Sequence, residues 1–162
     1  GVTVWRWMVD TPPAPFYAQF LKFQGNCDRK PHYEVHWPCH AIIKAIFVPA
    51  GTGGEGKPLH PDGFVMDSYN FMTPVSATET RYYWFQMRNF APDDADVSAR
   101  FAASVRGAFE EDRVILNAVQ QGMDAMRTPN LDLAIDLGPL RFRQRLRQMI
   151  EAEQPGAVAA AE

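Results

Sequence analysis

The chain has 162 residues, of which 46% are hydrophobic and 22% are charged, a balance typical of one globular domain. A formal net charge of -3 argues against binding to nucleic acid, and no apolar run reaches the length of a membrane-spanning helix. The two cysteines, Cys27 and Cys39, form neither a disulfide framework nor a CxxC metal site, so we expect a reducing, cytoplasmic location.

The first segment, from Val2 to about Gln24, predicts a strand and then a short helix. Val2, Val4, Trp5 and Trp7 are residue types that favour strands, and they predict a strand at the start of the chain. Prolines at positions 12, 13 and 15 precede the apolar residues 16–21. Because proline is favoured in the first turn of a helix, we expect a short helix there.

Residues from about Asp28 to Asn89 predict an antiparallel sheet. Tyr33, Val35 and Trp37 alternate with polar residues at the period of two that a half-buried strand shows. Three more strands are expected over residues 41–48, 64–72 and 80–87. The glycine-rich segment 51–56 lacks the Lys-Ser/Thr of a phosphate-binding loop, so we expect a flexible linker.

Three histidines, His32, His36 and His40, recur at every fourth position. On a strand they would share one face but span about 26 Å at roughly 3.3 Å per residue, too far for one metal to bind all three. We expect them to be solvent-facing side chains of a strand.

The last third of the chain predicts helices. Three aspartates between positions 93 and 96 favour the start of a helix that runs from about Val97 to Met126. A Thr-Pro-Asn sequence at 128–130 ends it, a second helix is expected over 141–151, and residues 152–162 are expected to form a flexible tail. Strands followed by a long helix predict an α+β fold, with a curved antiparallel sheet wrapped around the long C-terminal helix.

One carboxylate is out of place in the long predicted helix. At about 100° per residue, Asp112 falls within an apolar stripe on the face expected to meet the sheet. The stripe consists of Phe101, Val105, Ala108, Phe109, Ile115, Leu116, Val119, Met123 and Met126. A buried carboxylate needs a cation, a metal or hydrogen-bond donors. Spacing alone leaves three readings open: a metal ligand, a structural salt bridge, or a stripe that opens into solvent at this turn.

Several motifs occur in a characteristic order. They are VWRWMVDTPPAP from Val4 to Pro15, Asn26-Cys27-Asp28-Arg29, Thr73-Pro74 with Thr78-Glu79-Thr80-Arg81-Tyr82-Tyr83-Trp84, Glu111-Asp112-Arg113-Val114-Ile115-Leu116 with Gln120-Gln121, and Leu133 to Glu151. Together they resemble the C-terminal catalytic domain of the vanillate O-demethylase oxygenase family, which consists of Rieske non-haem iron oxygenases. Lys30 and Val75-Ser76 depart from the family pattern.

The resemblance implies a helix-grip, lipid-transfer-like fold that encloses a substrate pocket, with residues 1–151 as the catalytic domain. In the family, two histidines and one carboxylate hold a mononuclear Fe(II). The carboxylate position corresponds to Asp112. Candidate pocket residues are Met72, Tyr83, Phe85 and Met87. The implied activity is that of a monooxygenase or O-demethylase of methoxy- or methyl-aromatic compounds in aromatic catabolism.

The resemblance also implies a [2Fe-2S] Rieske cluster, a reductase that supplies electrons from NAD(P)H, and a homotrimer in the full-length protein. The sequence contains neither the Rieske motif nor the segment with the two iron-binding histidines. Because Gly1 stands where a start methionine would be expected, we expect either a truncated piece of a longer oxygenase or a stand-alone domain. We expect the chain alone to be catalytically inactive. The alternative function is a non-enzymatic helix-grip domain that binds an apolar or aromatic ligand.

Overall fold

A computed structural model describes residues 1–126 and 131–153. Its contacts divide the chain into two compact units, one made of Gly1–Asn89 with Asp132–Glu162 and the other of Phe90–Leu131. The predicted end of the long helix at 128–130 lies outside the described residues, and so does most of the predicted tail, residues 154–162. In the part of the chain that is described, no helix is both long and apolar enough to cross a membrane.

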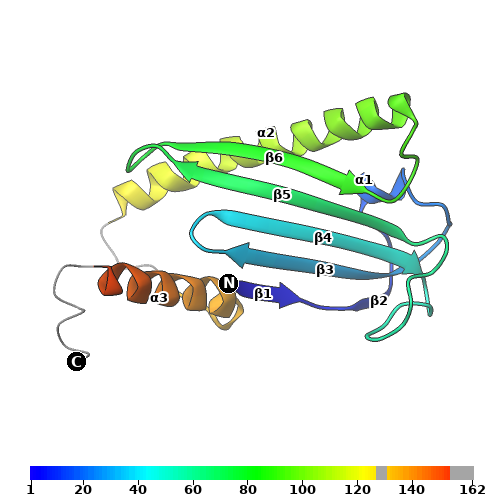
Figure 1. The fold of residues 1–162 in the computed structure, drawn as a ribbon, viewed down its shortest axis with the longest axis horizontal. Helices are drawn as coiled ribbons and strands as arrows, with labels where there is room; N and C mark the ends of the chain where they lie inside the picture. The colour runs from blue at the N-terminus through cyan, green and yellow to red at the C-terminus, as the bar shows by residue number, and fades with distance from the viewer. Residues whose placement is uncertain (127–130, 154–162) are drawn as a thin grey trace. The chain divides into compact units, whose positions relative to one another are not determined.

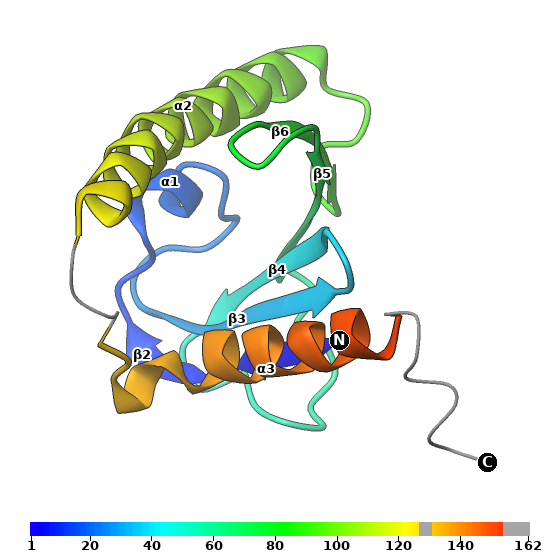
Figure 2. The same ribbon diagram turned by 90° about the vertical axis from the view of Figure 1, so that its left-hand side faces the viewer.

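The first unit is built on a curved, unclosed antiparallel sheet (Figures 1 and 2). Its described strands are β1 (Val2–Trp5), β2 (Met8–Thr11), β3 (Cys27–His36), β4 (His40–Pro49), β5 (Phe64–Pro74) and β6 (Thr80–Arg88). The strand order is β1-β3-β4-β5-β6, and β2 also pairs with β3. The strands predicted over residues 41–48, 64–72 and 80–87 are confirmed, whereas the predicted opening strand forms two strands, β1 and β2, and Trp37 lies in the turn after β3.

The register assigns strand side chains to two faces, because successive residues point to opposite sides of a sheet. One cross-strand row is Val4, Tyr33, Ile43, Ser68 and Gln86, and we call its side the inner face. The neighbouring row is Trp5, His32, Lys44, Asp67 and Met87, and its side is the outer face. The register therefore determines which predicted site residues can share a surface.

The inner face carries most of the buried apolar side chains of the sheet. Phe47, Phe64 and Met66 lie on it and are almost fully buried. Tyr17, in the short helix α1 (Pro15–Ala18), packs on Phe47 and Phe64 with ring centroids 4.5 and 5.6 Å apart. In Figure 2, α1 lies inside the curve of the sheet, so the inner face is the concave one.

A second helix of this unit, α3 (Leu137–Ala152), lies beside β1 and follows the 3-10 turn η1 (Ala134–Asp136) (Figure 2). The approach of α3 is close, since a Cβ atom added to Gly138 would lie 3.0 Å from a methyl group of Val4. A glycine in the first turn of α3 therefore allows this helix to pack on the edge of the sheet.

Asp28, in β3, connects the strand β2 and the glycine-rich loop of the first unit. Its side chain is 1% exposed, and its two carboxylate oxygens accept hydrogen bonds from the backbone N–H groups of Asp10 and Gly53, each at 2.9 Å. Burial raises the pKa of the Asp28 carboxyl group, but the backbone donors Asp10, Gly53 and Gly51 outweigh it and hold this pKa below its usual value. The glycine-rich segment, predicted as a flexible linker, is therefore anchored to β3.

The second unit contains the long helix α2 (Ala95–Ala125). Asp94 caps it by accepting a hydrogen bond from the Val97 backbone N–H at 2.9 Å, which confirms the acidic helix start expected from the sequence. Phe90 packs edge-on against Phe101 within this unit, with ring centroids 5.8 Å apart. A curved antiparallel sheet and a long helix together confirm the predicted α+β class and are the elements of a helix-grip fold.

Candidate functional site

Asp112 lies in the middle of α2, and its side chain is exposed. Its neighbours on the predicted apolar stripe, including Ile115, Leu116 and Val119, are exposed as well. The expected burial of Asp112 is therefore not found in this chain. The stripe is buried only near the start of α2, at Phe101 and Val105, and the described residues of the second unit contain no other helix or strand that packs around Asp112. Spacing alone left three interpretations of Asp112 open. The observed position of its side chain matches the one in which the apolar stripe opens into solvent at this turn.

A single carboxylate does not make an iron site. Among the described residues, no group of three or more His, Cys, Asp or Glu side chains is arranged to hold a metal ion. The described residues therefore do not by themselves fit the two-histidine, one-carboxylate set, and the role of Asp112 as a ligand stays a prediction.

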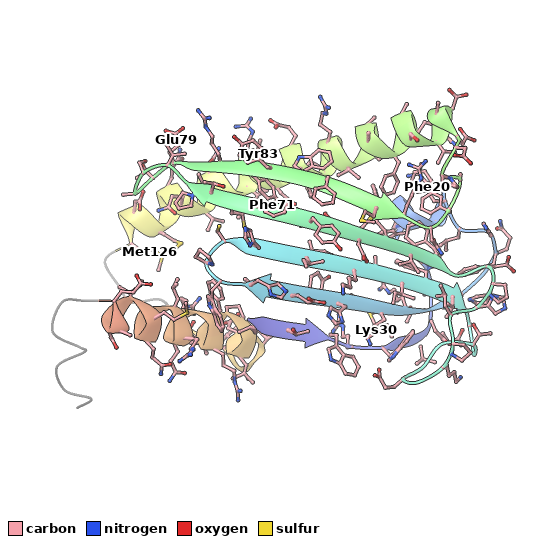
Figure 3. The ribbon with its side chains drawn as sticks, in the orientation of Figure 1. Phe20, Lys30, Phe71, Glu79, Tyr83 and Met126 are labelled. Carbon is pink, nitrogen blue, oxygen red and sulfur yellow. The ribbon has the colours of Figure 1, made fainter. Side chains whose placement is uncertain are left out.

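The four predicted pocket residues lie on two faces of the sheet. Tyr83, Phe85 and Met87 are on the outer face of β6, where about half of each residue is exposed. Figure 3 labels Tyr83 on this strand. Phe85 stacks on Tyr69 with ring centroids 4.8 Å apart. Met72 is on the inner face, opposite Tyr82. The structure therefore separates Met72 from the other three, and their pocket roles stay predictions.

Met72 lines an apolar cavity of about 600 Å³ between the inner face and α3. The cavity is lined by Val2, Val4, Tyr33, Val35, Pro38, Cys39, Met72, Gly138, Pro139, Phe142 and Arg143. Phe142 also stacks on Trp37, with centroids 6.1 Å apart and an interplanar angle of 16°. A mostly apolar cavity with a few polar residues in its lining, here Tyr33, Cys39 and Arg143, is typical of small-molecule sites.

A buried polar network lies on the same inner face. Ser68 and Asn70 are each 2% exposed. The Tyr82 hydroxyl donates to Asn70 Oδ1 at 2.7 Å, Asn70 Nδ2 donates to the Ser68 carbonyl at 3.1 Å, and Gln86 Nε2 donates to Ser68 Oγ at 3.3 Å. Polar side chains at buried positions need such partners. Sequence reasoning missed this network, although Ser68 and Asn70 interrupt the apolar alternation of β5 and could have signalled it.

The three histidines lie on the outer face, but they are not on a single strand as expected: β3 ends at His36, and His40 begins β4 opposite it. Glu34 is between two of them, and its carboxylate oxygens lie 2.9 Å from His32 Nε2 and 3.1 Å from His36 Nε2. Lys44 Nζ is 2.9 Å from the same carboxylate. The Lys44 ammonium, followed by His36 and His32, lowers the pKa of Glu34 from 4.5 to about 2. The cluster is therefore built around one carboxylate, which forms an ion pair with Lys44 and hydrogen bonds with His32 and His36.

This network predicts a specific pH dependence of stability. Because the pKa of Glu34 is lower in the folded state, its contribution is complete above about pH 4.5 and is lost as the pH falls toward 2. Its side chain is 18% exposed. After allowance for solvent screening, we expect a loss on the order of 1–2 kcal/mol in the free energy of unfolding over this range. Urea denaturation at pH 6 and pH 3 should show a smaller pH effect in Glu34→Gln than in the wild type. Equal pH effects in both proteins would contradict the assignment.

Comparison with known proteins identifies the family. Residues 1–152 match the family model described as the vanillate O-demethylase oxygenase C-terminal domain. The chain is 29% identical over 159 residues to the vanillate O-demethylase oxygenase subunit of Pseudomonas sp. (strain ATCC 19151), covering 92% of this chain and 47% of that protein. It is 28% identical over 157 residues to the toluene-4-sulfonate monooxygenase system iron-sulfur subunit of Comamonas testosteroni, covering 96% of this chain and 45% of that protein.

A further relative is the oxygenase component of chloroacetanilide N-alkylformylase from Rhizorhabdus wittichii, which is 28% identical over 155 residues and matches 94% of this chain and 42% of its own length. The chain therefore spans less than half the length of these relatives. The family match covers both structural units and nearly all of the described residues. The chain belongs to the family of vanillate O-demethylase oxygenase C-terminal domains.

Proposed function

We propose that the chain is the substrate-binding and partial iron-binding portion of a Rieske-type aromatic oxygenase. The family match over residues 1–152 carries this proposal. The names of the relatives support an aromatic substrate, since they refer to vanillate, toluene-4-sulfonate and a chloroacetanilide. The activity proposed for the longer protein is O-demethylation or monooxygenation of methoxy- or methyl-aromatic compounds in the cytoplasm.

In this proposal, Asp112 is the carboxylate ligand of a mononuclear Fe(II) that would activate O₂. Its exposed position on α2 leaves the carboxylate accessible to an iron ion whose other ligands would come from outside the described residues. Asp112 would anchor the ion and neutralise part of its charge. A Rieske cluster, a reductase using NAD(P)H and a homotrimeric assembly complete the proposed full-length enzyme.

The substrate is proposed to contact the inner face of the sheet. Met72 is supported as a contact by its position in the apolar cavity. The buried network of Ser68, Asn70 and Tyr82 would supply hydrogen-bonding groups on the same face. A pocket role for Tyr83, Phe85 and Met87 would require another part of the longer protein to cover the outer face, where they are exposed.

The proposal can be tested by turnover of the longer protein. With the upstream portion restored and a reductase and NADH supplied, we expect a methoxybenzoate to release formaldehyde as NADH and O₂ are consumed. A sample without the reductase serves as the control. Failure of every methoxy- and methyl-aromatic compound in a panel to cause substrate-dependent O₂ consumption would contradict the proposed activity.

The apolar cavity favours one alternative function, a non-enzymatic helix-grip domain that binds an apolar or aromatic ligand. Its lining comes entirely from the first unit, so it requires neither Asp112 nor iron. Tight binding of an aromatic compound to the longer protein without any turnover would favour this alternative over the proposed oxygenase.

A further inference from the structure

Two histidines face each other at one end of the sheet. His36 ends β3 and His40 begins β4, and the two residues are direct cross-strand partners. Both side chains are on the outer face, and directly opposed residues of an antiparallel pair have Cβ atoms about 4.5–5.5 Å apart. The turn between the strands therefore brings two imidazole rings close enough to share one metal ion, which a single straight strand would not do.

A carboxylate fixes the ring of His36 in one protonation form. His36 Nε2 lies 3.1 Å from Glu34 Oε2. Because the Lys44 ammonium lowers the pKa of Glu34 to about 2, this carboxylate is ionised at neutral pH and can only accept, so His36 Nε2 donates the hydrogen bond. In the neutral imidazole, Nδ1 then carries the free lone pair. Metal-binding histidines typically donate their other ring N–H to a carboxylate in this way.

The ring of His40 has both nitrogen atoms available. Its side chain is exposed and lies edge-on to Phe71, with ring centroids 4.9 Å apart. In the part of the chain that is described, neither ring nitrogen of His40 has a hydrogen-bond partner. His36 and His40 also line one hollow of the outer face, about 300 Å³ in volume, together with Tyr69 and Phe71. An ion that carries water ligands can therefore reach both rings.

The ligand atoms select the class of ion. Imidazole nitrogen suits zinc, copper and nickel, whereas Mg²⁺ and Ca²⁺ prefer oxygen ligands. Since no group of three or more His, Cys, Asp or Glu side chains among the described residues is arranged to hold a metal ion, water would fill the remaining positions. Two protein ligands hold an ion less tightly than the four of a structural zinc site, so binding should be reversible.

We propose that His36 and His40 form a two-histidine site on the outer face for a divalent transition-metal ion of the zinc and copper class. His36 Nδ1 is one ligand, an imidazole nitrogen of His40 is the other, and Glu34 positions the His36 ring. The site contains neither Asp112 nor a residue of the inner face, so the proposal goes beyond the mononuclear iron site and the substrate cavity and depends on neither.

Isothermal titration calorimetry of the 162-residue chain with Zn²⁺ at pH 7.5 tests this site. The wild type should bind about one Zn²⁺ per chain. His36→Gln and His40→Gln should each weaken binding by at least about tenfold, which is the effect that loss of even an outer-shell partner has on a metal site. Both side chains are exposed, so both variants should remain folded, and urea denaturation checks this.

The chain has four histidines, and the other two provide matched controls. His60 lies in a loop, where its Nδ1 accepts a hydrogen bond from the Asp62 N–H at 3.1 Å, and His32 contacts the other carboxylate oxygen of Glu34. His60→Gln and His32→Gln should bind Zn²⁺ as the wild type does. The proposal is overturned if the wild type does not bind Zn²⁺, if His36→Gln or His40→Gln keeps the wild-type affinity, or if either control loses as much affinity as they do. None of these outcomes depends on turnover or on the iron of the longer protein.

Discussion

Replacing Asp28 with alanine is expected to lower the free energy of unfolding by about 3–5 kcal/mol, because it leaves two buried backbone donors unpaired and removes buried atoms. The carboxylate accepts hydrogen bonds from the N–H groups of Asp10 and Gly53, both at 2.9 Å. The glycine-rich loop packs closely on this side chain, since a Cβ atom added to Gly53 would lie 2.6 Å from the Cβ atom of Asp28. Asp28 therefore connects both β2 and the glycine-rich loop to β3.

Urea denaturation of the chain measures this effect. Asp28→Asn should lose less stability than Asp28→Ala, because the amide oxygen still accepts one of the two hydrogen bonds. Asp62→Ala is the matched control, since Asp62 is an exposed loop aspartate and its removal should change the free energy of unfolding by less than about 0.5 kcal/mol. A loss below about 1 kcal/mol in Asp28→Ala would contradict this expectation and would show that water or another acceptor replaces the carboxylate.

The strands were predictable because alternation is a local property of the sequence. Tyr33, Val35 and the apolar run of β4 lie in strands as expected. The strand β3 nevertheless begins at Cys27 and contains Pro31, whose carbonyl accepts a hydrogen bond from the Arg6 N–H. Pairing with β1, β2 and β4 extends the strand beyond what local preference predicts. The anchor of the glycine-rich loop was not predictable either, since Gly53 is 25 residues away from Asp28.

The candidate site was predictable only in part. A helical wheel identifies Asp112 as a carboxylate within an apolar stripe. It does not show whether another part of the protein covers that stripe. The predicted pocket set was divided by the register of β5 and β6, which places Met72 opposite Tyr82 and Tyr83 opposite Phe71. A shift of one residue would exchange the two faces, and alternation within one strand does not determine that register. The cavity is lined by residues of β1, β3 and α3 together with Met72, so no local sequence motif predicts it.

Asp112→Ala is expected to abolish binding of mononuclear iron in the longer protein, with the upstream portion restored. Removal of the carboxylate would leave two neutral histidines, which neither neutralise the charge of Fe(II) nor complete the facial set of three ligands. Turnover should fall with the iron, whereas the Rieske cluster should be retained, since its ligands are cysteines and histidines of another domain. The fold should also be retained, because the Asp112 side chain is exposed.

Glu111→Ala is the matched control, since it removes a neighbouring exposed carboxylate of α2 that points about 100° away around the helix. The most direct test of the central claim is the iron content per chain of the wild type and the two variants. A chain with one Rieske cluster and one mononuclear site should contain about three iron ions. We predict about two in Asp112→Ala and about three in Glu111→Ala, with the cluster spectrum unchanged in both. An Asp112→Ala protein that keeps the wild-type iron content would contradict the assignment of Asp112 as the carboxylate ligand.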